Sequence, residues 1–157
     1  MQVNFTKPLS AAKKREITEA CNFYANLLMD PRTVRNLNID IEVVKKHDMM
    51  GECISDDDDR YPRFFTIVLR DGPGDDDYLK TLAHEMVHVK QYAKRELVSG
   101  IMVAAKGGFK ITCKWMGDVW KPKSKEDDYY DSPWEIEAYG REVGLYKRWV
   151  EYAGGVK

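Results

Sequence analysis

The sequence predicts one α+β domain covering residues 1–157. Three observations lead to this prediction. Apolar residues recur at helical spacing near the start, in the middle and near the end of the chain, shorter segments between them alternate apolar and polar residues, and the length fits a single hydrophobic core. We therefore expect an N-terminal helix, a small mixed or antiparallel sheet, a central helix and a C-terminal helix.

The first helix is predicted from a serine cap and an apolar stripe. Ser10 can cap its first turn, and the helix must end before Pro31. Its predicted core residues are Ile17, Ala20, Cys21, Tyr24, Leu27 and Leu28. Alternation or β-branched and aromatic content predicts strands at Leu37–Val44, Met49–Ile54, Phe64–Leu69 and Phe109–Trp115.

The central helix is expected from about Asp76 to Leu97. One side of it is apolar and faces the core, whereas His84 and His88 project from almost the opposite side. This second side must face a cleft built by later residues. The expected core residues are Leu79, Leu82, Met86, Val89, Ala93 and Leu97.

Within this helix lies the sequence His84-Glu85-Met86-Val87-His88, an H-E-x-x-H motif. Residues four apart on an α-helix lie one above the other, so both imidazoles can reach one ion. Zinc suits two imidazole ligands, and Glu85 would sit beside the ion as a candidate catalytic base. The motif predicts a catalytic Zn²⁺ site.

A catalytic zinc site usually has a third protein ligand. Because His47, the remaining histidine, lies on or near an early strand, a carboxylate on the last helix is the more plausible ligand. Glu135 and Glu137 compete, and they project about 200° apart. We favour Glu137, because Glu135 belongs to a capping box and Glu137 shares its side of the helix with Gly140 and Gly144, where close helix packing is expected.

The start of the last helix is predicted from the capping-box sequence Ser132-Pro133-Trp134-Glu135, with proline at the first helical position. Its predicted core stripe comprises Ile136, Tyr139, Val143, Tyr146 and Val150.

Composition restricts the function classes. The chain has 25 basic and 26 acidic residues, so its charge does not indicate a nucleic-acid partner. It lacks an apolar run long enough to span a membrane, and its three cysteines form no C-x-x-C pair. We expect a cytoplasmic protein with reduced thiols and no membrane association; the oligomeric state is not predicted.

The H-E-x-x-H motif followed by Trp134-Glu135-Ile136-Glu137-Ala138 resembles the zincin metallopeptidases of the gluzincin type. More narrowly, it resembles small SprT-like or phage-encoded predicted metallopeptidases, which would place the protein in the cytoplasm of an infected host. The resemblance implies a zincin-like fold and hydrolysis of a peptide or protein substrate. The third histidine and cysteine ribbon of SprT-type proteins are missing, so their DNA-linked role is not expected.

The expected mechanism is peptide-bond hydrolysis by a zinc-activated water, with Glu85 as general base and His84, His88 and Glu137 as ligands. Tyr129, Tyr130 and Tyr139 are candidate donors to the oxyanion, and Phe64–Leu69 is a candidate edge strand for substrate.

Two alternatives stay open. Gly51-Glu52-Cys53-Ile54-Ser55 is similar to the cysteine-ligand segment of peptide deformylases, although its first two residues are inverted. In that case Cys53 would bind the metal. The other alternative is a non-enzymatic, metal-containing binding or regulatory module on the same fold, against which the intact Glu85 argues.

Overall fold

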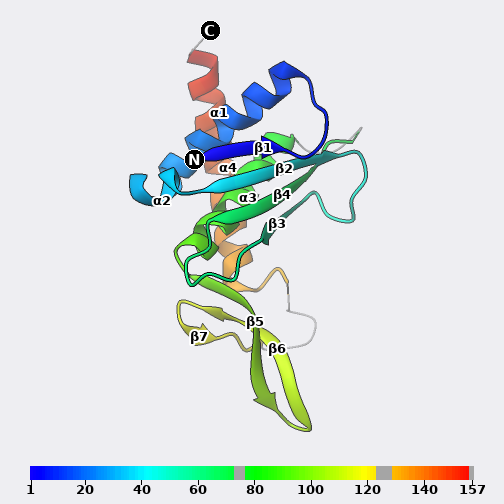
Figure 1. Cartoon of the computed structure of the whole chain (residues 1–157), viewed down its shortest axis with the longest axis vertical. Helices are drawn as coiled ribbons and strands as arrows, with labels where there is room; N and C mark the ends of the chain where they lie inside the picture. Colours follow the sequence, from blue (N-terminus) through cyan, green and yellow to red (C-terminus); the bar gives the residue numbers. More distant parts are fainter. Residues whose placement is uncertain (73–76, 123–128, 156–157) are drawn as a thin grey trace.

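The computed structural model describes residues 1–72, 77–122 and 129–155 and has an α+β fold (Figure 1). Its elements follow in the order β1 (Gln2–Phe5), α1 (Ala11–Leu28), α2 (Pro31–Arg35), β2 (Asn38–Val44), β3 (Gly51–Ser55), β4 (Phe64–Arg70), α3 (Tyr78–Ala93), β5 (Leu97–Ala105), β6 (Gly108–Trp115), β7 (Asp118–Val119) and α4 (Pro133–Gly155).

The first half of the chain forms a mixed four-stranded sheet in the order β1-β2-β4-β3. Strands β1, β2 and β4 are parallel, and β3 is antiparallel to β4. The predicted strands are therefore confirmed, but β4 lies inside the sheet, paired on both sides. The expectation that Phe64–Leu69 forms a sheet edge is wrong, since β3 takes the edge position.

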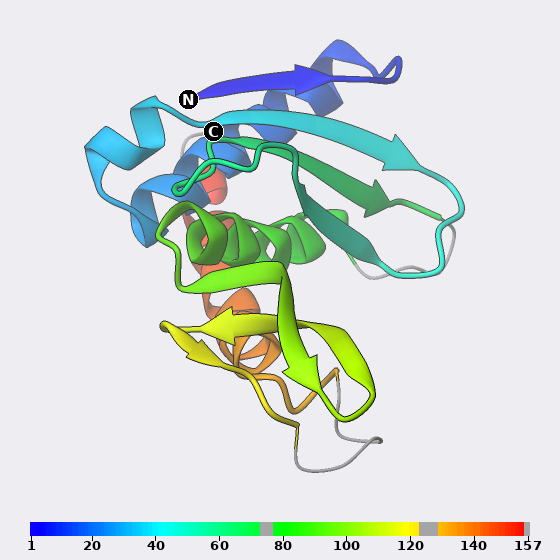
Figure 2. The same ribbon diagram turned by 60° about the horizontal axis from the view of Figure 1, so that its bottom comes forward.

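Helices α1 and α3 lie on the same side of this sheet (Figures 1 and 2). The alternation predicted for the strands explains the arrangement, because Ile39 and Ile41 of β2 and every second residue of β4 from Phe65 on are buried on the side of the helices. Ser10 caps α1 through the backbone N–H of Lys13, and Tyr24 donates a buried hydrogen bond of 3.1 Å to the carbonyl of Leu79 on α3. The core thus fixes α3 against the sheet.

Helix α3 is shorter at its C-terminal end than the sequence predicts. It is capped by the side chain of Asp77 and ends at Ala93; Asp76, the expected start, lies outside the described residues. Arg95 adopts a positive φ of 60°, and Leu97 already belongs to β5. Leu97, the last residue of the predicted apolar stripe, is buried as expected, but it lies in β5 and not in the helix.

Strands β5, β6 and β7 form a separate antiparallel sheet. The β5–β6 hairpin projects away from the first sheet and its helices (Figures 1 and 2). At its base, Trp115 and Trp120 contact Trp134 at the start of α4, with ring centroids 6.4 and 5.8 Å apart respectively. These aromatic contacts join the second sheet to the helix that follows it.

Helix α4 begins at Pro133, as predicted, but buries a different face. Ile136, Tyr139 and Val143 of the expected stripe are each more than 40% exposed. The buried residues are instead Glu135, Ala138, Leu145 and Trp149. None of the described helices is long and apolar enough to cross a membrane.

Candidate metal centre

The two motif histidines lie on the side of α3 that faces α4, and both are almost fully buried. Their Nε2 atoms are 3.2 Å apart, as expected for residues four apart on one face of a helix. The two imidazoles therefore point toward one place.

The carboxylate that reaches the histidines belongs to Glu135. Its Oε1 lies 3.4 Å from Nε2 of His88, and its Oε2 lies 3.3 Å from Nε2 of His84. Burial alone would disfavour the charged form, but the two neighbouring histidines lower the pKa of Glu135 to about 2. The sequence assigned this residue to a capping box; however, the backbone N–H of Ser132 bonds to the carbonyl of Tyr129, which leaves the Glu135 side chain to the histidines.

The arrangement could hold a metal ion. One ligand atom from each of His84, His88 and Glu135 forms a group in which all three lie within 4.8 Å of one another. At metal–ligand distances near 2.0–2.1 Å, the ligand atoms of a tetrahedral site would be about 3.3 Å apart. The two Nε2 atoms are 3.2 Å apart, and each lies 3.3–3.4 Å from a different oxygen of the Glu135 carboxylate. In addition, Oε2 of Glu135 is buried and makes no hydrogen bond to any of the described residues. A bound cation would compensate for burying this oxygen.

Glu137 does not reach this group. Its carboxylate accepts hydrogen bonds from Lys90, Gln91 and Arg141 at 2.7, 3.0 and 2.9 Å. The close helix packing inferred from the glycines is also wrong, because a Cβ added at Gly140 or Gly144 would meet nothing within 4 Å. The expected delivery of Glu137 to the histidines thus fails on geometry, and Glu135 takes that place.

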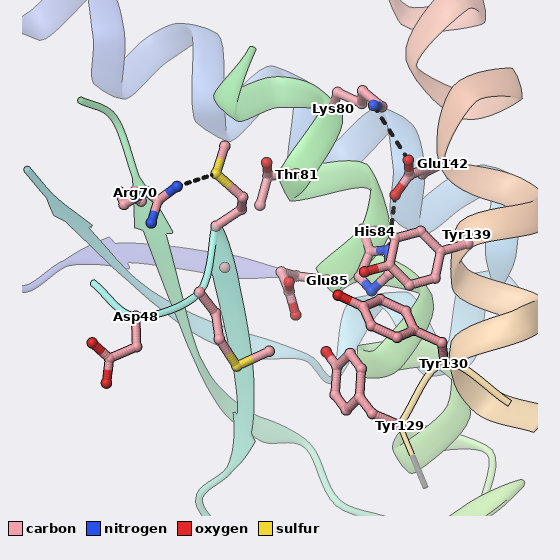
Figure 3. Close-up of a pocket in the computed structure, with 13 residues that line it drawn as sticks. Asp48, Arg70, Lys80, Thr81, His84, Glu85, Tyr129, Tyr130, Tyr139 and Glu142 are labelled. Carbon is pink, nitrogen blue, oxygen red and sulfur yellow. Dashed lines mark hydrogen bonds and ion pairs between the residues drawn. The ribbon is translucent and has the colours of Figure 1, made fainter. Parts of the chain in front are cut away.

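Each histidine has a second partner at its other ring nitrogen. Nδ1 of His84 lies 2.8 Å from Oε2 of Glu142, and Nδ1 of His88 lies 2.8 Å from Oε1 of Gln91. A carboxylate can only accept, so Nδ1 of His84 carries the hydrogen, and Nε2 is the nitrogen that would bind a metal. Lys80 lies 3.4 Å from Glu142 and completes a chain that leads to the histidine (Figure 3). Neither Glu142 nor Gln91 was identified from sequence.

Glu85 lies deep in the cleft beside these residues and is 4% exposed. Burial raises its pKa to about 8, and a divalent cation bound nearby would favour the carboxylate form again. The side chain rests against the backbone of Gly51 on β3. A Cβ at that position would lie 2.6 Å from Oε1 of Glu85 and 2.6 Å from Cγ2 of Thr81, so glycine leaves the space that Glu85 occupies.

A cavity of about 320 Å³ opens on the His84 side of Glu85. Tyr129, Tyr130 and Tyr139, the three tyrosines named as possible oxyanion donors, all line it (Figure 3). The ring of Tyr139 packs on the His84 imidazole, with centroids 4.6 Å apart.

A second cavity of about 210 Å³ lies on the His88 side, and Gly51, Glu85 and Tyr129 line both cavities. Cys53 lines this second cavity together with His88 and Glu135, but it is not part of the three-residue group. The two cavities thus flank Glu85 along strand β3.

Comparisons with protein-family models, with curated proteins and with solved structures give no match to this chain. The functional assignment therefore depends on the site itself.

Proposed function

We propose that this protein is a zinc-dependent peptide hydrolase of the zincin type, with His84, His88 and Glu135 as its metal ligands. The observation that carries the proposal is the convergence of two Nε2 atoms and one buried carboxylate at separations of 3.2–3.4 Å, beside a buried glutamate in an open cleft. A zinc ion held there would supply Lewis-acid activation of water and polarisation of the scissile carbonyl.

The chain's own residues account for the remaining chemistry. Glu85 would accept a proton from the attacking water and return it to the leaving amine. Glu142 would hold the imidazole of His84 through its Nδ1–H. A tyrosine hydroxyl in the cavity, from Tyr129, Tyr130 or Tyr139, would donate to the developing oxyanion.

We infer that the substrate binds as an extended strand along the free edge of β3. Met50 and Arg70, and Asp56 and Phe64, are joined by backbone hydrogen bonds at the two ends of the β3–β4 pair. Because bonded and non-bonded pairs alternate in an antiparallel ladder, the backbone groups of Gly51, Cys53 and Ser55 point away from β4. The backbone groups of Gly51 and Cys53 border the cleft that holds Glu85, and a peptide chain could pair with this edge.

The first experiment measures zinc content and peptide cleavage together. Wild-type protein should bind one zinc ion and cleave members of a peptide library. Glu135→Gln should lose zinc binding, whereas Glu137→Gln should keep it, although with weaker affinity. If Glu135→Gln retains wild-type affinity and Cys53→Ala loses it, the Cys53 ligand set is correct and our assignment fails.

The second experiment separates an enzyme from a non-enzymatic metal module. Glu85→Gln should retain zinc and lose peptide cleavage by at least about 100-fold, because it removes the proton acceptor. Wild-type protein that binds zinc but cuts no peptide would support the binding module and refute the hydrolase. Glu151→Gln, an exposed change on α4, is the matched control and should alter neither property.

The strand-pairing proposal has its own test. Cys53→Pro removes a backbone N–H that points to the cleft, and edge strands tolerate proline where the N–H is not used within the sheet. We expect a lower kcat/KM than in Cys53→Ala, with unchanged zinc affinity. Equal kcat/KM in the two variants would show that substrate does not pair with this edge.

A further inference from the structure

Glu137, the residue favoured from sequence as third ligand, lies in a partly buried polar network beside the metal centre. Gln91, which is fully buried, connects this network to His88. The amide nitrogen of Gln91 lies 2.9 Å from the carbonyl oxygen of Trp134 and 3.0 Å from Oε2 of Glu137. The side chain of Gln91 thus links α3 to the first turns of α4, next to His88.

These partners determine which way the Gln91 amide is oriented. A backbone carbonyl and a carboxylate can only accept hydrogen bonds, so the amide NH₂ must face both of them. Its oxygen must then face His88, 2.8 Å away, where it can only accept. Nδ1 of His88 therefore carries the hydrogen, and Nε2 is the nitrogen that would bind the metal.

Glu137 is itself held in place from the other side. Lys90, which is 6% exposed, lies 2.7 Å from Oε1 of Glu137, and Arg141 lies 2.9 Å from the same oxygen. Lys90 is also paired with Glu96 at 2.5 Å. The cations thus hold one oxygen of Glu137, and the second oxygen is directed at Gln91.

We propose that Gln91 and Glu137 are positioning residues for the metal centre: Glu137 orients the Gln91 amide, and Gln91 fixes the tautomer and ring orientation of His88. This inference depends on the proposed zinc site but not on the reaction it catalyses. Partners of this kind around metal-binding histidines commonly change metal affinity about 10- to 100-fold when they are removed.

The test compares zinc affinity in single and double variants, measured by competition with a chromophoric chelator. Gln91→Met keeps the length of the side chain and removes the acceptor for His88, so zinc should bind about 10- to 100-fold more weakly. Glu137→Gln should weaken binding less. Because Glu137 acts through Gln91, the double variant should bind no more weakly than Gln91→Met alone.

Two outcomes would overturn the proposal. Additive losses in the double variant would show that Glu137 does not act through Gln91, and unchanged affinity in Gln91→Met would show that Gln91 does not position His88. Arg148→Gln, an exposed change on the same helix, is the control and should leave affinity unchanged. Both outcomes are read from zinc affinity and neither requires peptide cleavage. A failure of the hydrolase proposal, which the cleavage assay detects, is therefore distinguishable from a failure of this inference.

A spectroscopic measurement on the wild type avoids variants that fail to fold. In zinc-loaded protein, ¹H–¹⁵N spectra of the imidazoles should show His88 bound through Nε2, with an Nδ1–H signal protected from exchange with water. Cobalt substitution should give an absorption spectrum that changes in Gln91→Met. Coordination of His88 through Nδ1 would refute the proposal directly.

Discussion

At the scale of single residues, the motif could be placed from sequence but its surroundings could not. The four-residue spacing places His84 and His88 on one face of any α-helix, whatever packs around it. Glu142 carries no local pattern and meets His84 only because α3 packs against α4. Gln91 lies on α3 itself, three residues after His88, so its contact with that histidine is local, and only its partners Trp134 and Glu137 belong to α4. The role of Glu142 and the orientation of the Gln91 amide therefore depend on tertiary contacts.

Gly51 illustrates a requirement that only the packed structure reveals. In Gly51→Ala, the new Cβ would overlap the carboxylate of Glu85 and the methyl group of Thr81. We expect a loss of about 1–3 kcal/mol in unfolding free energy, typical of overpacking, together with a fall in peptide cleavage as Glu85 is displaced. Chemical denaturation and a cleavage assay measure the two effects.

The matched control for Gly51 is Gly144→Ala on α4. A Cβ there meets nothing within 4 Å, and the exposed helical position favours alanine, so unfolding free energy should rise by about 0.5–1 kcal/mol. If Gly51→Ala is as harmless as Gly144→Ala, the contact between Glu85 and β3 is not rigid.

A second residue-scale prediction concerns Asp71, at the end of β4. Hydrogen bonds and charge from Lys13 and then Lys45 outweigh partial burial and hold the pKa of Asp71 below its ordinary value of 3.8. Since the folded-state pKa is the lower one, the stabilisation is complete above the ordinary value and is lost as the pH falls through the folded-state pKa.

The measurement compares wild type with Asp71→Asn over this range. At neutral pH the variant should be less stable by up to about 1 kcal/mol, the size expected of a partly exposed ion pair. The difference in unfolding free energy should shrink below pH 3.8, where the wild-type carboxylate becomes protonated. A difference that stays constant down to low pH would show that the charge of Asp71 is not responsible.

At the scale of elements, the existence of the helices and most strands could be predicted, but the buried face of α4 could not. Apolar periodicity selected Ile136, Tyr139 and Val143, yet the buried stripe is Glu135, Ala138, Leu145 and Trp149. The buried stripe includes Glu135 because this side chain faces the two histidines. A search for apolar periodicity does not find a buried polar residue of this kind. The choice of Glu137 as ligand had other grounds, namely the capping box assigned to Glu135 and the close packing expected at Gly140 and Gly144, and the structure shows neither.

The position of Trp149 provides a test of the corrected face. Its ring packs against Phe23 and Tyr24 of α1 and Tyr152 of α4, with centroids 5.7, 6.3 and 5.8 Å away respectively. Trp149→Ala should lower the free energy of unfolding by about 3–5 kcal/mol, as expected for a large buried side chain.

The neighbouring Val150 belongs to the face predicted from sequence and is 49% exposed. Val150→Ala should therefore change the free energy of unfolding by no more than about 0.5 kcal/mol. Denaturant unfolding of both variants decides between the two faces. Equal costs at the two positions would show that α4 is rotated relative to the structure.

At the scale of the whole molecule, β5 is the part least expected from sequence, whereas its partner β6 confirms the strand predicted at Phe109–Trp115. The chain was predicted to be helical up to Leu97 and weakly patterned after Gly100, because the residues of β5 do not alternate as a half-buried strand does. The hairpin is held mainly by its own ladder and by the aromatic contacts at its base. Met102 pairs with Ile111, and Ala104 pairs with Phe109, on one exposed apolar face.

This exposed face leads to the last prediction. Met102, Phe109 and Ile111 are 74%, 77% and 75% exposed, so replacing all three with threonine removes little buried area and preserves β propensity. The free energy of unfolding should change by less than about 1 kcal/mol, and zinc affinity should be unchanged, since the metal centre is built by α3 and α4. Denaturation and chelator competition measure these values, with size-exclusion chromatography at several protein concentrations alongside. A loss of more than about 2 kcal/mol together with a smaller apparent size would show that a second copy of the chain covers this face in solution, because burial on that scale requires a partner.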